Sequence, residues 1–327
     1  TLTREQIQDL KKVFIVACGT SYHVGVVAKY AFERLLKIPL EVDVASEFRY
    51  RDPILDDKTL VIIISQSGET ADTLAALRMA KERGCRILSI VNVVGSTIAN
   101  ESDDVLYTWA GPEIAVASTK AYSTQLAVIY LIALYMADQL GTVPQGEMAQ
   151  YLADLQRLPD LAEACLADKK TIQYFASQYF NAHDMYFIGR NVDYAASLEA
   201  SLKLKEISYI HSEAYTAGEL KHGPISLIED GTLVIAISTY EKLFDKMMSN
   251  VREVKARGAV VLGITVRGRE DALKQETDYQ FCVPKITDFM LPSLSILPLQ
   301  LFAYYVASMK GCDIDKPRNL AKSVTVE

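Results

Sequence analysis

Short apolar runs alternate along the chain with longer segments of helical periodicity. The apolar runs predict strands at residues 13–18, 60–65, 87–92 and 105–110. They are apolar throughout rather than alternating, which is typical of parallel strands covered on both faces. Segments 22–37 and 71–84 predict the intervening helices, and Gly84 is expected to end the second. The pattern predicts an α/β fold built on a doubly wound parallel sheet.

The whole pattern occurs twice. Five segments of the first half match five of the second half in the same order and at nearly constant spacing: 13–19 with 185–191, 45–50 with 217–222, 58–65 with 231–238, 80–90 with 254–264, and 125–130 with 300–305. A charged helical segment at about 145–170 is the expected connector. The repeat predicts two tandem units at 1–150 and 151–311, followed by a tail at 312–327.

A small polar motif, SQSGET, follows the predicted strand 60–65 and precedes a helix. Ligands of doubly wound sheets bind beyond the carboxyl ends of the strands, and helix N-termini favour anions. Ser65, Gln66, Ser67 and Thr70 would add side-chain donors, and Gly68 would allow close backbone approach. The motif contains no lysine, which favours a monophosphate over a nucleotide. An ordinary capped helix start explains the pattern equally well.

The second copy of this motif is different. At residues 238–244 it reads STYEKLF, which has lost the set of small polar residues. We therefore expect the first unit alone to bind the anion.

Two further polar loops precede predicted helices. CGTSYH at 18–23 could cradle part of a ligand through Thr20 and Ser21, or it could be a simple strand-to-helix turn. In EIAVASTKAYSTQ at 113–125, Ser118, Thr119 and Lys120 could cap the following helix or face a site. The spacing does not separate these alternatives.

The segment 202–224 carries a dense set of acidic and basic residues. Lys203 and Glu206 are three residues apart and share one helix face. A buried acid there would have a raised pKa and could move protons, whereas a surface ion pair would have no such role. His222 precedes Gly223-Pro224 and is expected in a loop, as a general acid or base or as a solvated residue.

The C-terminal tail at 313–327, DIDKPRNLAKSVTVE, lacks an amphipathic period. It could be a flexible charged segment, or it could fold over a site as a lid. Lys322 stands between small residues. If it were shielded from water, its amine could lose a proton and form an imine.

Composition narrows the class of protein. Half of the 327 residues are hydrophobic and 23% are charged, as in globular proteins, and the net charge of −7 argues against nucleic-acid binding. The apolar run 126–137 is too short to span a bilayer and is expected in the core or a subunit interface. Five scattered cysteines predict a reduced, cytoplasmic protein without disulfides, and four histidines without ligand spacing predict no metal site. We also expect no signal peptide before the fold. The start at Thr1 suggests an excised part of a longer protein, and processing of the chain is the alternative.

Seven motifs stand together in one order: CGTSY, ASEFRYR, SQSGETADTLA, VASTKAY, LKLKEISYIHSEAY, AGELKHGP and PRNLAKSVTVE. With them, nearly the whole chain resembles the isomerase part of the glucosamine-6-phosphate synthase family, which consists of two tandem sugar isomerase (SIS) domains. SQSGET alone would indicate only the SIS superfamily, and the tail together with KLKEISYIH narrows the resemblance to the synthase family.

The resemblance implies roles for the matching residues. Ser65, Gln66, Ser67 and Thr70 would hold the sugar phosphate. Sugar contacts and closure of the pocket would come from Thr20, Ser21, Val116, Ser118 and Ala321. The catalytic set would be Glu206 as the base, Lys203 beside it, His222 for ring opening and Lys322 as a Schiff-base or ring-opening amine. His222 would reach over from the partner subunit of a homodimer.

The resemblance also implies the reaction. Fructose 6-phosphate and ammonia would give glucosamine 6-phosphate, with no cofactor. Because the glutaminase domain of the complete synthase is expected to be missing, the chain alone would interconvert fructose 6-phosphate and glucose 6-phosphate. The second-copy loop GRNVDYAA departs from the GRGxxYP pattern expected of the family.

Two alternative hypotheses about the function remain. One is another SIS enzyme, such as a deglycase or a deaminase of an amino-sugar phosphate, against which the tail argues. The other is a non-catalytic sugar-phosphate sensor, against which Glu206, His222 and Lys322 argue together. A DNA-binding partner domain would favour the sensor.

Overall fold

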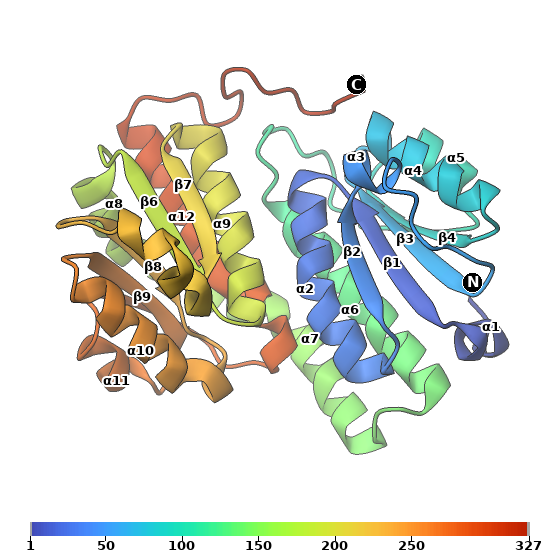
Figure 1. Ribbon diagram of the computed structural model, residues 1–327, viewed down its shortest axis with the longest axis horizontal. Helices are drawn as coiled ribbons and strands as arrows, with labels where there is room; N and C mark the ends of the chain where they lie inside the picture. Colours follow the sequence, from blue (N-terminus) through green and yellow to red (C-terminus); the bar gives the residue numbers. More distant parts are fainter. Residues whose placement is uncertain (1, 326–327) are drawn as a thin grey trace. The chain divides into compact units, whose positions relative to one another are not determined.

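The computed structural model describes residues 2–325, which form two compact units (Figure 1). The first unit runs to Leu152 and also includes residues 321–325 of the tail, and the second is Ala153–Leu320. Of the tail expected at 312–327, residues 312–320 thus belong to the second unit and residues 321–325 to the first, and residues 326–327 lie outside the described residues.

The first unit is built on a five-stranded parallel sheet of order β2-β1-β3-β4-β5. Its strands are β1 (Lys12–Ala17), β2 (Leu40–Val44), β3 (Thr59–Ser65), β4 (Arg86–Val91) and β5 (Asp104–Tyr107). The four predicted strands are confirmed. The prediction of β5 to residue 110 was too long, because Trp109 has a φ of 52°, which a strand does not accommodate.

Helices cover both faces of this sheet, as expected for apolar parallel strands. They are α1 (Arg4–Asp9), α2 (Gly19–Leu36), α3 (Ala45–Phe48), α4 (Ala71–Glu82), α5 (Thr97–Glu101), α6 (Lys120–Leu140) and the start of α7 (Gln145–Leu166). Phe14, Val16 and Ile63 pack with α3, α4 and α5, while α2 and α6 pack side by side (Figure 1). α2 begins three residues earlier than predicted, so Thr20 and Ser21 lie in its first turn.

The second unit repeats this architecture, with strand order β7-β6-β8-β9-β10. Its strands are β6 (Asp184–Gly189), β7 (His211–Thr216), β8 (Leu233–Ile237), β9 (Val260–Val266) and β10 (Tyr279–Val283). The helices are α8 (Lys169–Tyr179), α9 (Val192–Ser208), α10 (Phe244–Lys255), α11 (Glu270–Lys274) and α12 (Pro292–Met309), with 3₁₀ turns η1 (Ala217–His222), η2 (Pro224–Leu227), η3 (Glu241–Leu243) and η4 (Asp288–Met290). The predicted repeat is confirmed, and α7 forms most of the predicted connector.

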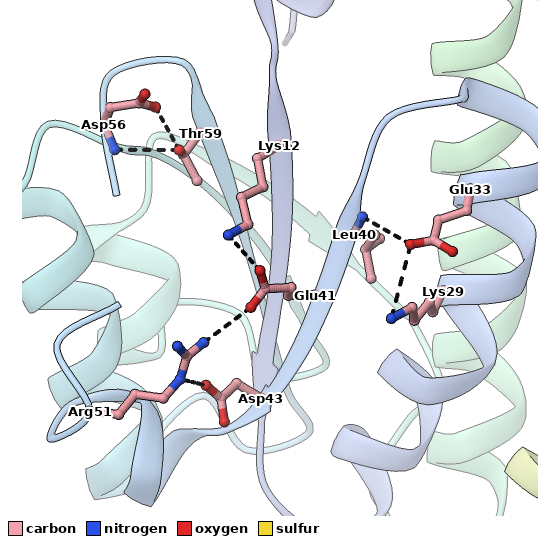
Figure 2. Close-up of polar contacts among 9 residues, drawn as sticks. All are labelled: Lys12, Lys29, Glu33, Leu40, Glu41, Asp43, Arg51, Asp56 and Thr59. Carbon is pink, nitrogen blue, oxygen red and sulfur yellow. Dashed lines mark hydrogen bonds and ion pairs between the residues drawn. The ribbon is translucent and has the colours of Figure 1, made fainter. Parts of the chain in front are cut away.

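Charged side chains line the outer strand β2 of the first sheet (Figure 2). Glu41 lies 2.5 Å from Lys12 Nζ and 3.3 Å from Arg51 Nη2, and Arg51 also binds Asp43. The hydrogen bond from Lys12 lowers the pKa of Glu41. Charges on an edge strand oppose pairing with another chain, so this network protects the sheet at no cost to its core.

One segment within residues 2–325, Asp288–Met309, is long and apolar enough to cross a membrane by length and composition. It includes η4 and α12, and 72% of its most apolar window is buried inside the structure. α12 packs against α8 and α9, so the segment has the place of a core helix. The apolar run 126–137 lies in α6 and is also mostly buried, with Leu131 and Tyr135 about half exposed.

Gly25 in α2 allows close approach of the helix to the sheet. A Cβ atom there would stand 2.7 Å from Val42 Cγ1 and 2.8 Å from Ile15 Cγ2. We predict that Gly25→Ala lowers the free energy of unfolding by about 1–3 kcal/mol, because the core must shift. Gly146→Ala, on an open position of α7, is the matched control and should leave stability unchanged or slightly raised. Urea denaturation measures both, and equal stabilities would contradict the packing argument.

Candidate functional site

The loop between β3 and α4 holds the SQSGET motif in a tight turn. Ser65 Oγ accepts a hydrogen bond from Gly68 N at 3.0 Å, and Ser67 Oγ accepts one from Glu69 N at 3.2 Å. Gly68 has a φ of 68°, and a Cβ atom there would lie 2.1 Å from Ser96 Oγ. Glycine is therefore required for both backbone conformation and space.

Two observations separate this loop from a plain helix cap. Thr70 is the N-cap residue of α4, yet its side chain makes no capping hydrogen bond, and its Oγ1 lies 3.4 Å from Ser65 Oγ. The carboxylate of Glu69 accepts hydrogen bonds from Thr97 N at 2.7 Å and Thr97 Oγ1 at 2.8 Å. Glu69 is thus held by Thr97 of α5. The hydroxyl groups of the SQSGET motif lie at the N-terminus of α4, where an anion is favoured.

The C-terminal tail lies against this loop. Ser323 Oγ donates to Ser67 Oγ at 3.2 Å, and Ala71 N donates to Val324 O at 3.2 Å. Lys322 Nζ donates to Ala115 O at 2.7 Å and to Ser118 Oγ at 3.3 Å. Residues 322–324 are therefore fixed by hydrogen bonds, as a lid would be.

A pocket of about 500 Å³ opens beside the loop and the tail. This volume suits a small ligand such as a sugar phosphate. The pocket combines amide and hydroxyl groups with the Lys322 amine, and it is lined by Gln66, Ser67, Asn92, Val93, Trp109, Gly111, Pro112, Glu113 and Lys322.

The other polar loops of the first unit take different roles. Ser21 Oγ donates to Gln125 Oε1 at 3.1 Å and is buried between α2 and α6, while Thr20 is half-buried at the carboxyl end of β1, next to β3. Glu113 accepts the hydrogen bond of Ala121 N at 2.9 Å, so Glu113 rather than Thr119 caps α6.

Three further residues of the predicted site lie near the contact between the tail and the loop before α6. Ser118 is turned toward Lys322, as described above. Val116 is half-buried on the same loop, and Ala321 is exposed at the start of the tail segment. The sequence did not point to Asn92, Trp109 and Glu113, because only the folded sheet brings the ends of β3, β4 and β5 to one edge.

In the second unit, α9 carries a buried group of charges. Lys203 Nζ lies 2.5 Å from Glu206 Oε2 and 3.4 Å from Glu199 Oε1. The side chains of Lys203 and Glu199 are 2% and 0% exposed and that of Glu206 is 19% exposed, so this is not a surface ion pair. Burial lowers the pKa of Lys203, but the two carboxylates raise it by more, and the ammonium stays charged. Glu206 retains partial access to solvent.

Glu199 was not singled out from the sequence. It stands four residues before Lys203 and seven before Glu206, which is the spacing of one helix face, and this spacing was a usable signal. His222 is exposed at the last position of η1, before Gly223 with a φ of 143°. The structure thus brings Lys203 and Glu206 together and places His222 on another element of the same unit.

Comparisons with known proteins agree with this architecture. The family model described as SIS domain matches residues 6–135 and 178–310, once in each unit. Proteins named glutamine–fructose-6-phosphate aminotransferase [isomerizing] from Clostridium tetani and Caldanaerobacter subterraneus are each 56% identical over 326 residues. They match 100% of this chain and 54% of their own length, so the chain spans about half the length of these relatives.

Two solved structures share the fold. The C-terminal domain of glucosamine-fructose-6-phosphate aminotransferase from Francisella tularensis has a TM-score of 0.93 and 38% identity, covering 96% of this chain and 88% of that chain. Glucosamine-6-phosphate deaminase from Thermotoga maritima has a TM-score of 0.77 and 26% identity, covering 98% and 92%.

The buried charges of α9 generate a stability prediction. Lys203→Met removes the ammonium beside Glu199 and Glu206 and should lower the free energy of unfolding by about 3–5 kcal/mol. The double variant Glu199→Gln/Lys203→Met should recover part of this loss, because the fully buried acid is neutralised. A double-mutant cycle by chemical denaturation measures the coupling, and additive effects of the two changes would refute it.

Proposed function

Because this chain belongs to the SIS domain family, we propose that it is the isomerase part of a glutamine–fructose-6-phosphate aminotransferase. It converts fructose 6-phosphate and ammonia to glucosamine 6-phosphate. The observation that carries the proposal is the contact of the Lys322 tail with the SQSGET loop, in a chain 56% identical to enzymes of that name.

The loop of the first unit holds the 6-phosphate. The hydroxyls of Ser65, Ser67 and Thr70 and the amide of Gln66 are its donors, supported by the N-terminus of α4. The lid contributes Lys322 and Ala321, and Thr20, Ser21, Val116 and Ser118 line or support the sugar side. Lys322, held by Ala115 O and Ser118 Oγ, serves as the amine for ring opening or Schiff-base formation.

The second unit supplies the proton transfer. After ring opening, ammonia adds to the C2 carbonyl and water leaves, giving the imine. Glu206 then takes a proton from C1 while the imine nitrogen gains one, which gives an enolamine. A proton is delivered to C2 as the C1 hydroxyl loses its own, and this leaves the aldehyde at C1 and the amine at C2 of glucosamine 6-phosphate. Lys203 positions the Glu206 carboxylate by the 2.5 Å ion pair. His222 acts in ring opening from the partner subunit of a homodimer.

The remaining partners follow from the same proposal. A glutaminase domain supplies ammonia, and the protein works in the cytoplasm without nucleic acid or membrane. In the absence of ammonia the same proton transfer interconverts fructose 6-phosphate and glucose 6-phosphate, and no cofactor enters either reaction.

Fructose 6-phosphate is the substrate that tests this proposal. Incubated with the chain alone, it should give glucose 6-phosphate, detected with a coupled dehydrogenase. Binding without conversion would favour the sugar-phosphate sensor. Release of ammonia from glucosamine 6-phosphate without hexose isomerisation would favour a deaminase, the activity in the name of the Thermotoga maritima protein.

Glu206→Gln tests the base. The amide cannot accept the C1 proton, so kcat for isomerisation should fall by about 100-fold or more while fructose 6-phosphate still binds. Glu163→Gln, at an exposed position of α7, is the matched control and should keep full activity. Turnover of Glu206→Gln equal to that of the control would remove Glu206 from the mechanism.

Ser67→Ala tests the phosphate loop. Loss of a hydrogen bond to a charged phosphate should raise KM for fructose 6-phosphate about tenfold, with a smaller effect on kcat. Ser249→Ala, on the exposed side of α10, is the control. An unchanged KM would count against the phosphate role of the loop.

A further inference from the structure

The second unit contains a loop that is topologically equivalent to SQSGET. In the first sheet Val13 pairs with Leu60, and in the second Met185 pairs with Leu233. The offset between β3 and β8 is therefore 233 − 60 = 173 residues. It places Ser238, Thr239 and Tyr240 at the positions of Ser65, Gln66 and Ser67.

A carboxylate of the chain itself occupies this second loop. Asp193, in the first turn of α9, is 1% exposed. One of its oxygens accepts the hydroxyl of Thr239, and the other accepts the backbone N–H of Tyr240 at 3.0 Å. The offset of 185 − 13 = 172 between β1 and β6 equates Asp193 with Ser21, which is turned toward Gln125 instead.

We propose that the β8 loop of the second unit is an oxyanion-binding site and that the carboxylate of Asp193 is its built-in ligand, so that a small free carboxylate binds there once this side chain is removed. The proposal extends the assignment of the first loop as a phosphate site. Its test needs neither sugar nor turnover.

The donors of this loop suit a carboxylate rather than a phosphate. Ser238 Oγ donates to Ile264 O at 3.0 Å and is turned away from the loop. Glu241 and Leu243 stand where the first loop has Gly68 and Thr70, so the close backbone approach and one hydroxyl are lost. A hydroxyl and an N–H remain, which match the two oxygens of a carboxylate.

The charge state of Asp193 is consistent with this role. Burial raises the pKa of Asp193, the hydrogen bonds from Thr239 and Tyr240 lower it, and the carboxylate of Asp288 raises it slightly, which together give a pKa of about 6. The carboxylate is therefore ionised at pH 7.5 in spite of complete burial. Its bonds also tie the first turn of α9 to the end of β8, and α9 is the helix that carries Lys203 and Glu206.

Asp193→Ala in the full chain tests the site, with sodium formate as the probe. In sodium chloride at pH 7.5 the variant should melt several degrees below the parent chain, because buried donors lose their acceptor. Formate at equal ionic strength should raise the Tm of the variant saturably, and by more than it raises that of the parent. Asp193→Asn, whose side chain still fills the loop, is the matched control and should gain nothing specific from formate.

Three results would overturn the proposal: equal melting of Asp193→Ala in formate and chloride, an equal formate effect on Asp193→Asn, or a variant as stable as the parent chain. If Asp193→Ala does not fold in sodium chloride, the variant is refolded in sodium formate instead. Recovery of the folded protein supports the carboxylate site, and a protein that stays unfolded rejects it. The double variant Asp193→Ala/Ser67→Ala should keep the rise in Tm caused by formate, because Ser67 belongs to the other loop. The formate experiment therefore tests the β8 loop independently of whether the first loop binds phosphate.

Discussion

Burial of parallel strands on both faces leaves their ends as the places where polar groups can gather. In each sheet the central strands are mostly apolar and buried, and β3 is buried at all seven positions. Hydrogen-bonding side chains therefore collect beyond the carboxyl ends, in SQSGET after β3 and in the Thr239–Tyr240 loop after β8. The two loops share this position because the two sheets share one topology, and their different residues give them different occupants.

The sheets and their repeat were predictable from the sequence because they depend on local apolar runs and on matches between segments. Errors fell at the ends of elements, as at Trp109, where a backbone conformation rather than hydrophobicity stops β5. SQSGET and the Lys203–Glu206 spacing were also recognisable as sites of chemistry. Both are local patterns, in one case a strand-to-helix junction and in the other a helix face.

Contacts between distant segments were not predictable in this way. Glu113 caps α6 in place of Ser118, Thr119 or Lys120, and this cap depends on the path of an irregular loop. The bond between Asp193 and Thr239 joins residues 46 apart, and each of them alone is an ordinary polar residue. Such pairs can be identified only when the strand register is known, because the register determines which loops at the ends of the strands are neighbours.

The tail has a consequence for how the protein is made. Ser323 and Ser67 are 256 residues apart, and their contact joins the last described residues of the chain to a loop of the first sheet. The first sheet can form while the ribosome is still adding the second, since domains fold as units from the N-terminus during synthesis. Its SQSGET loop nevertheless lacks the contacts of the tail until residues 322–324 emerge. A chain interrupted after Leu152 but before Lys322 would carry the first sheet without these contacts, so this site is completed only after the whole second unit has been made.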